Sequence, residues 1–197
     1  MLTRPADGFS LIELMTVVSL ISVLLMIGMP SFVTWTRNVK VRAAADELQN
    51  ALRMAQTEAI RRSRQVVFVR TTGSTASAAG LAADGGMRWA IVTLPLLDSD
   101  ESAEVVEAGA LTDTGSANGL TVSGGPAALC FNSAGRLMAN SSLPLTSGAC
   151  AEVNGLVNFN LAMSGADRPL RVTVAPAGQV RLCDPARTSQ PDGCPAS

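Results

Sequence analysis

The fold is decided by one stretch, Gly8 to Pro30, which reads GFSLIELMTVVSLISVLLMIGMP. From Phe9 to Met29 it holds a single ionisable side chain, Glu13, among aliphatic and small residues. A helix rises about 1.5 Å per residue, so this run is roughly 30 Å long and matches the hydrocarbon core of a bilayer. The stretch therefore predicts a membrane-spanning helix over 9–29, in which an acid is a candidate functional residue.

The residues around Glu13 form a motif with fixed spacing. Gly8 and Phe9 precede the apolar run, Glu13 stands five positions after Gly8, and Pro30 ends the run. The segment Gly8-Phe9-Ser10-Leu11-Ile12-Glu13 resembles the processing site of type IV prepilins and type II secretion pseudopilins. The resemblance implies that a prepilin peptidase cleaves between Gly8 and Phe9 and methylates the new amino group of Phe9. It also implies that Pro30 is a proline that kinks the helix.

In such a protein, the Glu13 carboxylate is expected to pair with an amino-terminal amine. Cleavage leaves a cationic amine at Phe9, one helical turn from the Glu13 carboxylate, and in a filament the acid of one subunit meets the amine of its neighbour. A buried ion pair sets register more reliably than it adds stability. We therefore expect Glu13 to direct docking of the subunit into a filament.

The segments flanking the apolar run complete the domain organisation. Residues 1–8 form a short leader that differs from an ordinary secretory signal, because its predicted cleavage site precedes the apolar run. Residues 9–29 are the expected transmembrane helix, and 30–63 continue it as an amphipathic segment. Residues 64–197 suffice for one head domain.

An apolar stripe indicates that the helix continues past the proline. Its members follow one another at steps of three and four: Val41, Ala45, Leu48, Leu52, Ala55 and Ala59. Pro30 removes one backbone hydrogen bond and is expected to bend the helix. The helix is expected to end near Arg62–Ser63 and to lay its stripe on a sheet.

The rest of the chain reads as strands separated by turn residues. The segment 71–86, rich in Gly, Ala, Ser and Thr, is expected to be a flexible loop. The clearest hairpin is Leu170–Val174 with Gln179–Cys183, in which Val172 and Val174 match Val180 and Leu182. The other expected strands are 65–70, 87–94, 105–106, 120–122, 129–132, 136–138 and 156–163. One helix packed on a largely antiparallel sheet is an α+β fold.

Three later segments sharpen the resemblance to the GspH/FimT group of minor pilins and pseudopilins. These are Leu52–Arg62 with the strand that follows, Leu129–Arg136, and Gly178–Asp184. The resemblance implies a pilin-like fold, with a long amino-terminal helix whose first half is transmembrane and a β-rich periplasmic head.

Four cysteines follow the apolar run: Cys130, Cys150, Cys183 and Cys194. Their spacing lacks the close pairs of a structural zinc site, and the chain has no histidine to complete one, so no metal is expected. An even number of cysteines in an anchored chain favours disulfides in an oxidising compartment. Three pairings are open, and Cys130–Cys150 with Cys183–Cys194 is preferred because each bond closes a local loop.

The distribution of charge leaves one conflict over orientation. Arg37, Lys40 and Arg42 follow the apolar run and only Arg4 precedes it, which by the positive-inside rule favours a cytoplasmic head. The cysteines and the prepilin-like motif argue for a head in the periplasm of a bacterial cell, and we give them more weight. The inner-membrane lipid is then one partner of the chain.

The composition argues against an enzyme and a cofactor. Without histidine there is no Ser-His-Asp or Cys-His arrangement, and neither a P-loop nor a dinucleotide-binding glycine motif is present. The run Asp98–Glu101 resembles a cation-binding loop only weakly, since it lacks EF-hand spacing. A solvated acidic loop is the preferred interpretation.

Nucleic acid is the rival class of partner. Some FimT-like minor pilins are linked to DNA uptake, and basic side chains contact phosphates through charge. The candidates are Arg61, Arg62, Arg64, Arg70 and Arg187. Against this, a helix carboxyl end suits cations, and few aromatic side chains are available for stacking.

These observations predict a non-enzymatic filament subunit of the GspH/FimT group. The expected partners are the prepilin peptidase and other minor and major pilins or pseudopilins. The expected role is in a tip complex that primes a type IV pilus or a type II secretion pseudopilus, and DNA uptake is the alternative.

Overall fold

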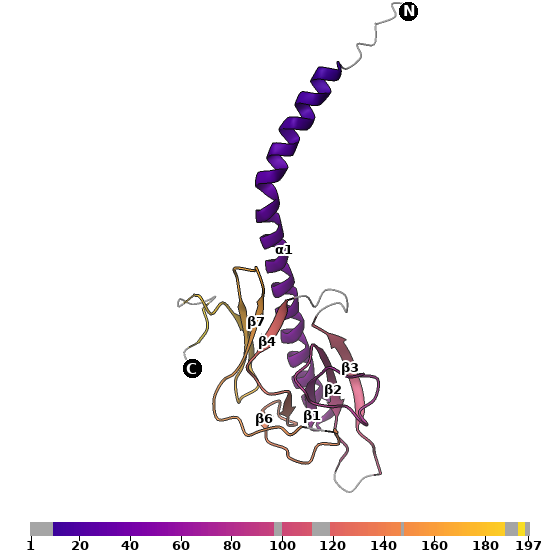
Figure 1. Cartoon of the computed structure of the whole chain (residues 1–197). Coiled ribbons are helices and arrows are strands. Elements are labelled where there is room, and N and C mark those ends of the chain that lie inside the picture. Colours follow the sequence, from indigo (N-terminus) through magenta and orange to yellow (C-terminus); the bar gives the residue numbers. More distant parts are fainter. Residues whose placement is uncertain (1–9, 97–99, 112–118, 147, 188–192, 196–197) are drawn as a thin grey trace, which may run out of the picture.

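A computed structural model describes residues 10–96, 100–111, 119–146, 148–187 and 193–195, apart from the side chains of Ile27 and Pro30. One long helix carries a β-rich head at its carboxyl-terminal half, while its amino-terminal half projects away from the head (Figure 1). The elements are α1 (Leu11–Arg62), β1 (Val66–Thr71), β2 (Arg88–Thr93), β3 (Glu104–Ala110), β4 (Leu120–Ser123), β5 (Ala128–Phe131), β6 (Leu137–Met138), β7 (Val157–Met163), β8 (Leu170–Val174) and β9 (Val180–Cys183).

The carboxyl-terminal half of α1 is packed inside the head. Every residue of the predicted stripe is fully buried, and Ala44 and Ala51 extend the stripe sideways. The helix ends at Arg62, because Ser63 takes a left-handed conformation with φ 52° and its N–H bonds back to the last turn. The predicted end of the helix and its buried face are both confirmed.

The strands form two antiparallel sheets, where a single sheet was expected. The first has the order β3-β2-β1-β5-β6 and the second the order β4-β7-β8-β9. Both sheets contact α1, through β1, β2 and β5 on one side and β7, β8 and β9 on the other. The helix therefore holds together two sheets that lie to either side of it in Figure 1.

The first sheet is covered on both faces. Val66 and Phe68 of β1 join the core under the helix, whereas Val67 and Val69 join a second cluster on the far face. That second cluster is closed by Leu81 and by the Cys130–Cys150 disulfide. A strand buried on both faces reads as a continuous apolar run, as VVFV does.

The loop between β1 and β2 packs on this far face, so the expectation that 71–86 is flexible is wrong. Leu81 is 2% exposed and Ala78 is 3% exposed. The Asp84 carboxylate accepts hydrogen bonds from the backbone N–H and the hydroxyl of Thr72, at 2.8 and 2.5 Å, and from the N–H of Gly86 at 3.0 Å. These contacts close the loop at its base.

Candidate functional site

The amino-terminal half of α1, residues 11–39, leaves an apolar surface uncovered. We call this segment the stem. Its large apolar side chains are between 44% and 83% exposed, and they are Leu11, Ile12, Leu14, Met15, Val17, Val18, Leu20, Ile21, Val23, Leu24, Leu25, Met26, Met29, Phe32, Val33, Trp35 and Val39. A continuous apolar surface of this extent marks a membrane or protein contact. The stem is therefore the first part of the candidate site.

Glu13 lies in the first turn of the stem and is exposed. A carboxylate suits this end of a helix, where free backbone N–H groups concentrate positive charge. The next polar side chain, Thr16, donates its hydroxyl to the Glu13 carbonyl at 2.8 Å and so is satisfied within the helix. Gly8 and Phe9, the predicted processing site, lie outside the described residues.

The stem is bent. Between Met26 and Ser31, an interval that contains Pro30, the helix axis turns by 46°. Among the described residues no single helix has the length and apolarity of a membrane span, whereas Leu11–Met26 and Ser31–Arg62 have them as a bent pair.

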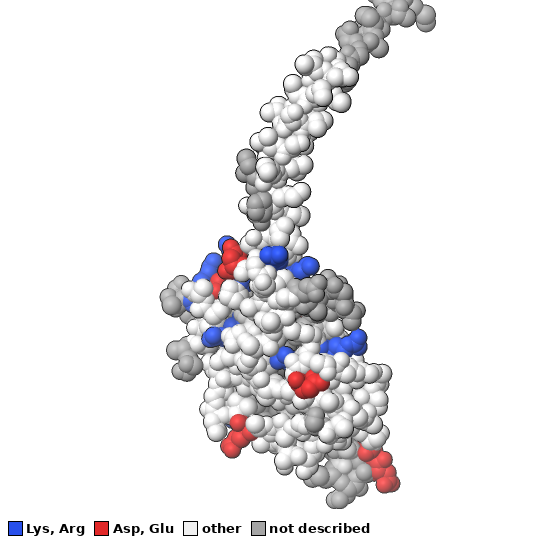
Figure 2. Space-filling view, in the orientation of Figure 1, with Lys and Arg blue, Asp and Glu red and all other residues white. Residues whose placement is uncertain are grey.

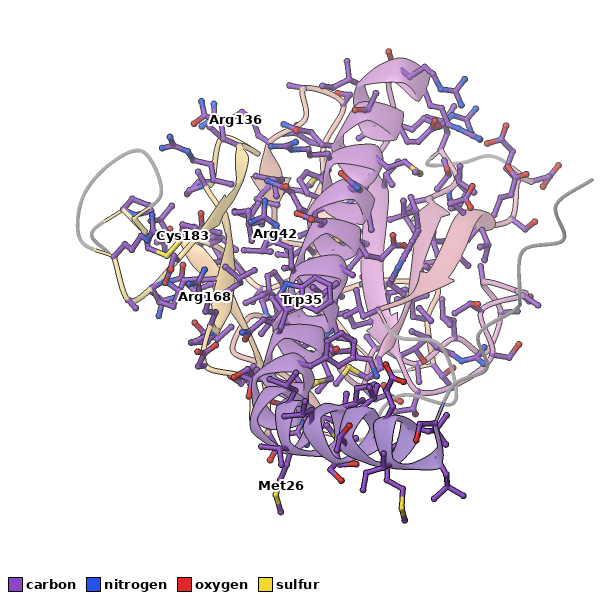
Figure 3. All side chains as sticks on the ribbon, turned by 90° about the horizontal axis from the view of Figure 1, so that it is seen from above. Met26, Trp35, Arg42, Arg136, Arg168 and Cys183 are labelled. Atoms are coloured by element: carbon purple, nitrogen blue, oxygen red, sulfur yellow. A yellow bond between two sulfur atoms is a disulfide. The ribbon has the colours of Figure 1, made fainter. Side chains whose placement is uncertain are left out.

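A groove of about 1040 Å³ lies where the stem enters the head. Trp35, Asn38 and Arg42 of α1 form one wall, and Arg168 before β8 and Cys183 of β9 form the other. Figure 3 views the molecule from above and shows Trp35 and Arg42 on the side of the helix that faces Arg168 and Cys183. The groove therefore continues the exposed surface of the stem onto the head.

One asparagine joins the two walls of the groove. The Asn38 amide donates to the Asp167 carboxylate at 2.5 Å, and its oxygen accepts from the N–H groups of Asp167 and Arg168 at 3.2 Å each. These three bonds fasten the β7–β8 turn to α1. The disulfide Cys183–Cys194 ties the carboxyl-terminal segment to the end of β9 beside the groove.

The basic residues proposed as DNA contacts are engaged in ion pairs at the far end of the helix. Arg61 and Arg62 reach Glu58 at 2.7 and 2.9 Å, and Arg62 also reaches Glu104 at 3.4 Å. Arg64 forms a two-pronged ion pair with Glu101. The pairs of Glu58 follow from its spacing of three and four residues on the same helix. Those of Glu101 and Glu104 were not indicated by the sequence, because these acids lie 37 and 42 residues along the chain from their partners.

The other two candidates differ from this cluster. Arg187 lies 3.6 Å from the Asp184 carboxylate, beside the groove. Arg70 is 3% exposed, so the expectation that it contacts phosphate is wrong. Its guanidinium donates to the carbonyls of Gly85 and Gly86 and lies 5.8 Å from the centre of the Phe159 ring. Burial lowers the pKa of Arg70, and the nearby Asp84 carboxylate opposes that shift.

The ion-pair cluster predicts a loss of stability in acid. Hydrogen bonds from Arg61 and then Arg62 lower the pKa of Glu58 below its ordinary value of 4.5. A depressed folded-state pKa gives stability that is fully present above pH 4.5 and is lost as the pH falls through the folded-state value. In urea titrations between pH 3 and 7, Glu58→Gln should therefore lower the free energy of unfolding above about pH 4.5. It should also flatten the acid limb, which is the fall of that free energy as the pH drops below about 4.5.

The control for this titration is Thr57→Val, next to Glu58 on the same helix, which removes a hydroxyl bonded within the helix and no acid, and which should keep the wild-type acid limb. A Glu58→Gln protein whose stability still falls as steeply as wild type between pH 4.5 and 3 would contradict the assignment.

No group of three or more metal-binding side chains lies close enough together to hold an ion in the part of the chain that the structure describes. Asp98 and Ser99 of the acidic run lie outside that part. Glu101 is committed to Arg64, and this ion pair lowers the Glu101 pKa.

Comparison with known proteins identifies the family. Residues 44–178 match the family described as type II transport protein GspH, and residues 3–29 match the prokaryotic N-terminal methylation motif. The chain belongs to the GspH family. It is thus a minor pilin or pseudopilin of a type IV pilus or a type II secretion system, and its methylation motif implies processing by a prepilin peptidase.

One of the similar solved structures supports the fold of this GspH-family chain. The type IV minor pilin FimU of Pseudomonas aeruginosa is 19% identical with a TM-score of 0.52, and the match covers 79% of this chain and 97% of that one. The minor pseudopilin EpsH of Vibrio cholerae is 16% identical with a TM-score of 0.46, covering 75% and 99%. A comparison with curated protein sequences finds no match.

The disulfides of this GspH-family head are the two local ones preferred from the sequence. Cys130–Cys150 closes a loop of 20 residues and Cys183–Cys194 one of 11. What the sequence did not indicate is the groove, since its walls come from positions more than 100 residues apart.

Proposed function

We propose that this GspH-family protein is a non-enzymatic subunit that helps to prime assembly of a type IV pilus or a type II secretion pseudopilus, within a complex of minor subunits at the tip. Cleavage between Gly8 and Phe9 produces the mature subunit. Residues 9–29 hold it in the inner membrane with the head in the periplasm, until it moves from the lipid into the filament.

One observation carries the proposal: a fully packed head continues directly into an apolar helix that nothing in the described structure covers. Such a helix suits two successive environments, lipid first and the stems of neighbouring subunits afterwards. The two disulfides suit a periplasmic head. The DNA-uptake alternative gains no support from the Arg61–Arg64 cluster, because its guanidinium groups already face carboxylates.

Intact mass of the protein taken from its native membrane tests the processing and the location together. The expected chain begins at N-methylated Phe9 and is four hydrogen atoms lighter than the reduced form, because each of its two disulfides forms with the loss of two hydrogen atoms. An uncleaved chain with free thiols would show an ordinary anchor facing the cytoplasm and would overturn the proposal. Genes for minor pilins or for a secretion system beside its own gene would decide which machine it serves.

Glu13 provides the test of assembly. Glu13→Val should leave membrane insertion and cleavage unchanged but lower incorporation into filaments at least about tenfold, since the carboxylate then no longer meets the amine of a neighbouring subunit. The measurement is the fraction of subunit in sheared or affinity-purified filaments relative to the membrane pool.

The matched control for this test is Thr16→Val, one turn further along the stem, whose hydroxyl bonds only within its own helix. It should be incorporated as wild type is. Normal incorporation of the Glu13→Val protein would remove the role given to the acid.

A further inference from the structure

Four basic side chains surround the helix where the stem meets the head. Arg37, Lys40 and Arg42 belong to α1, and Arg168 belongs to the turn between β7 and β8. We call these four residues the basic collar. Figure 2 shows several Lys and Arg side chains at this junction with an acidic group among them, and further acidic groups lower on the head.

The structure fixes the collar on more than one element. Arg37 lies over Gly165, where an added Cβ would overlap its guanidinium. The bonds from Asn38 to the backbone N–H of Arg168 hold that residue beside the helix. The collar is thus a built surface, since residues separated by more than 120 positions are brought to one level of the molecule.

The nearby acids of the head, Asp46 and Asp167, balance only part of the positive charge of the collar. Arg42 pairs with Asp46 at 3.2 Å, and the other nearby acid, Asp167, accepts from Asn38. Within the part of the chain that the structure describes, no ion pair involves Arg37, Lys40 or Arg168. The collar therefore presents net positive charge toward the stem.

Along α1, the basic collar lies at the position where a bilayer that holds the stem has its surface. Phe32 and Trp35 are exposed with ring centres 5.8 Å apart, and Trp is enriched where a helix leaves the hydrocarbon. Arg37 and Lys40 follow Met29 by roughly 12 and 16 Å of helix. Long basic side chains at that distance reach back into the headgroup layer.

This level also bears on the conflict over orientation. Three cations directly after an apolar run oppose translocation of the head, so with a periplasmic head we expect these cations to have a binding partner on that side. A lipid surface of negative charge is such a partner. A second copy of the chain does not, because it would bring an identical set of cations to the same level.

We propose that the basic collar binds the anionic phospholipid headgroups of the membrane in which the stem is anchored. The head is thereby held against the bilayer until the subunit enters a filament. This inference rests on the membrane anchoring given above as the proposed function. It adds a defined lipid contact that the subunit gives up on leaving the membrane.

The chain offers a specific chemical probe, because Lys40 is its only lysine. The full chain is placed in nanodiscs, one chain per disc, made of phosphatidylcholine alone or with phosphatidylglycerol. A neutral amine-acylating reagent is added, and peptide mass spectrometry measures the rate of Lys40 modification separately from that of the terminal amine. We expect modification to be about fivefold slower in the anionic discs, and the difference to vanish at about 1 M salt.

Two variants separate binding by the collar from the general effect of a charged surface. Arg168→Gln leaves the lipid unchanged but removes a collar residue on another element, and it should restore at least half of the Lys40 reactivity. Arg136→Gln is the matched control, since Arg136 is exposed on the turn after β5, against the far end of α1 near Ile60. It should leave the protection of Lys40 unchanged.

The outcomes distinguish this proposal from the one on which it rests. Equal Lys40 rates in the two lipids, with the chain still in the discs, would overturn the collar and leave the anchor standing. A chain that leaves the discs would overturn the anchor itself. If the protection of Lys40 increases with the number of chains per disc and does not depend on lipid charge, a second copy covers the collar. That result would also overturn the proposal.

Discussion

Leu52→Ala is expected to lower the free energy of unfolding of the head by about 3 kcal/mol, within the 2–5 kcal/mol seen for buried leucines. Leu52 is fully buried in the middle of the stripe, in the core that α1 shares with both sheets. Truncation leaves a cavity that neither sheet is free to close, because each is also held to the helix at other positions. The loss is therefore expected at the upper part of the range of ordinary substitutions.

Denaturation of the full chain in mild detergent measures this loss. Trp89 is 4% exposed and reports on the core, so a Trp35→Phe background leaves a single fluorescent reporter. The control is Met54→Ala, two positions away on the same helix and 40% exposed, which should cost less than about 1 kcal/mol. Equal losses for the two variants would contradict the packing described for α1.

Gly178→Ala is expected to destabilise the head by about 3 kcal/mol or to prevent its folding. Gly178 has φ +89°, and a Cβ there would overlap the carbonyl oxygen of Gly135 and crowd the amide of Gln56. Gln56 donates to that same carbonyl at 3.0 Å. The glycine therefore lets the β8–β9 turn, the β5–β6 turn and the helix meet at one point.

The control for Gly178 is Gly155→Ala, because an added Cβ at Gly155 meets nothing within 4 Å. Its midpoint of unfolding should stay within about 0.5 kcal/mol of wild type. A Gly178→Ala protein as stable as the Gly155→Ala protein would show that the two turns separate without cost.

Much of the architecture could be predicted from local sequence patterns. The helical stripe depends on spacing alone, so its six buried residues and the end at Arg62 were predictable. The β8–β9 hairpin brings together the four residues that were predicted to match, and it pairs Val172 with Leu182 and Val174 with Val180. In both cases the partners lie within a few turns or a few residues of each other along the chain.

The division into two sheets was not predictable in the same way. Strand β5 pairs with β1, about 60 residues earlier, whereas β4 pairs with β7, about 40 residues later. Local alternation says which face of a strand is apolar but not which distant strand lies beside it. For β1 it does not even distinguish the faces, since VVFV is apolar on both.

Arg70 and the loop beside it show how tertiary structure overrides composition. By composition Arg70 belongs with a basic surface and 71–86 with a mobile linker. Instead, the carbonyls of Gly85 and Gly86 offer the guanidinium a buried hydrogen-bonding site, and Leu81 gives the loop an apolar anchor. Both contacts exist only once the loop has folded back over the sheet.

The continuity of α1 from stem to core has a mechanical consequence. A subunit drawn out of the membrane, or pulled within a filament, receives the force along the helix axis. The stripe passes that force to six strands of two sheets together, so the contacts are loaded in shear and share the strain rather than yielding one after another. If the subunit is pulled in this way, we expect the bend between Met26 and Ser31 to straighten before the packed head is strained.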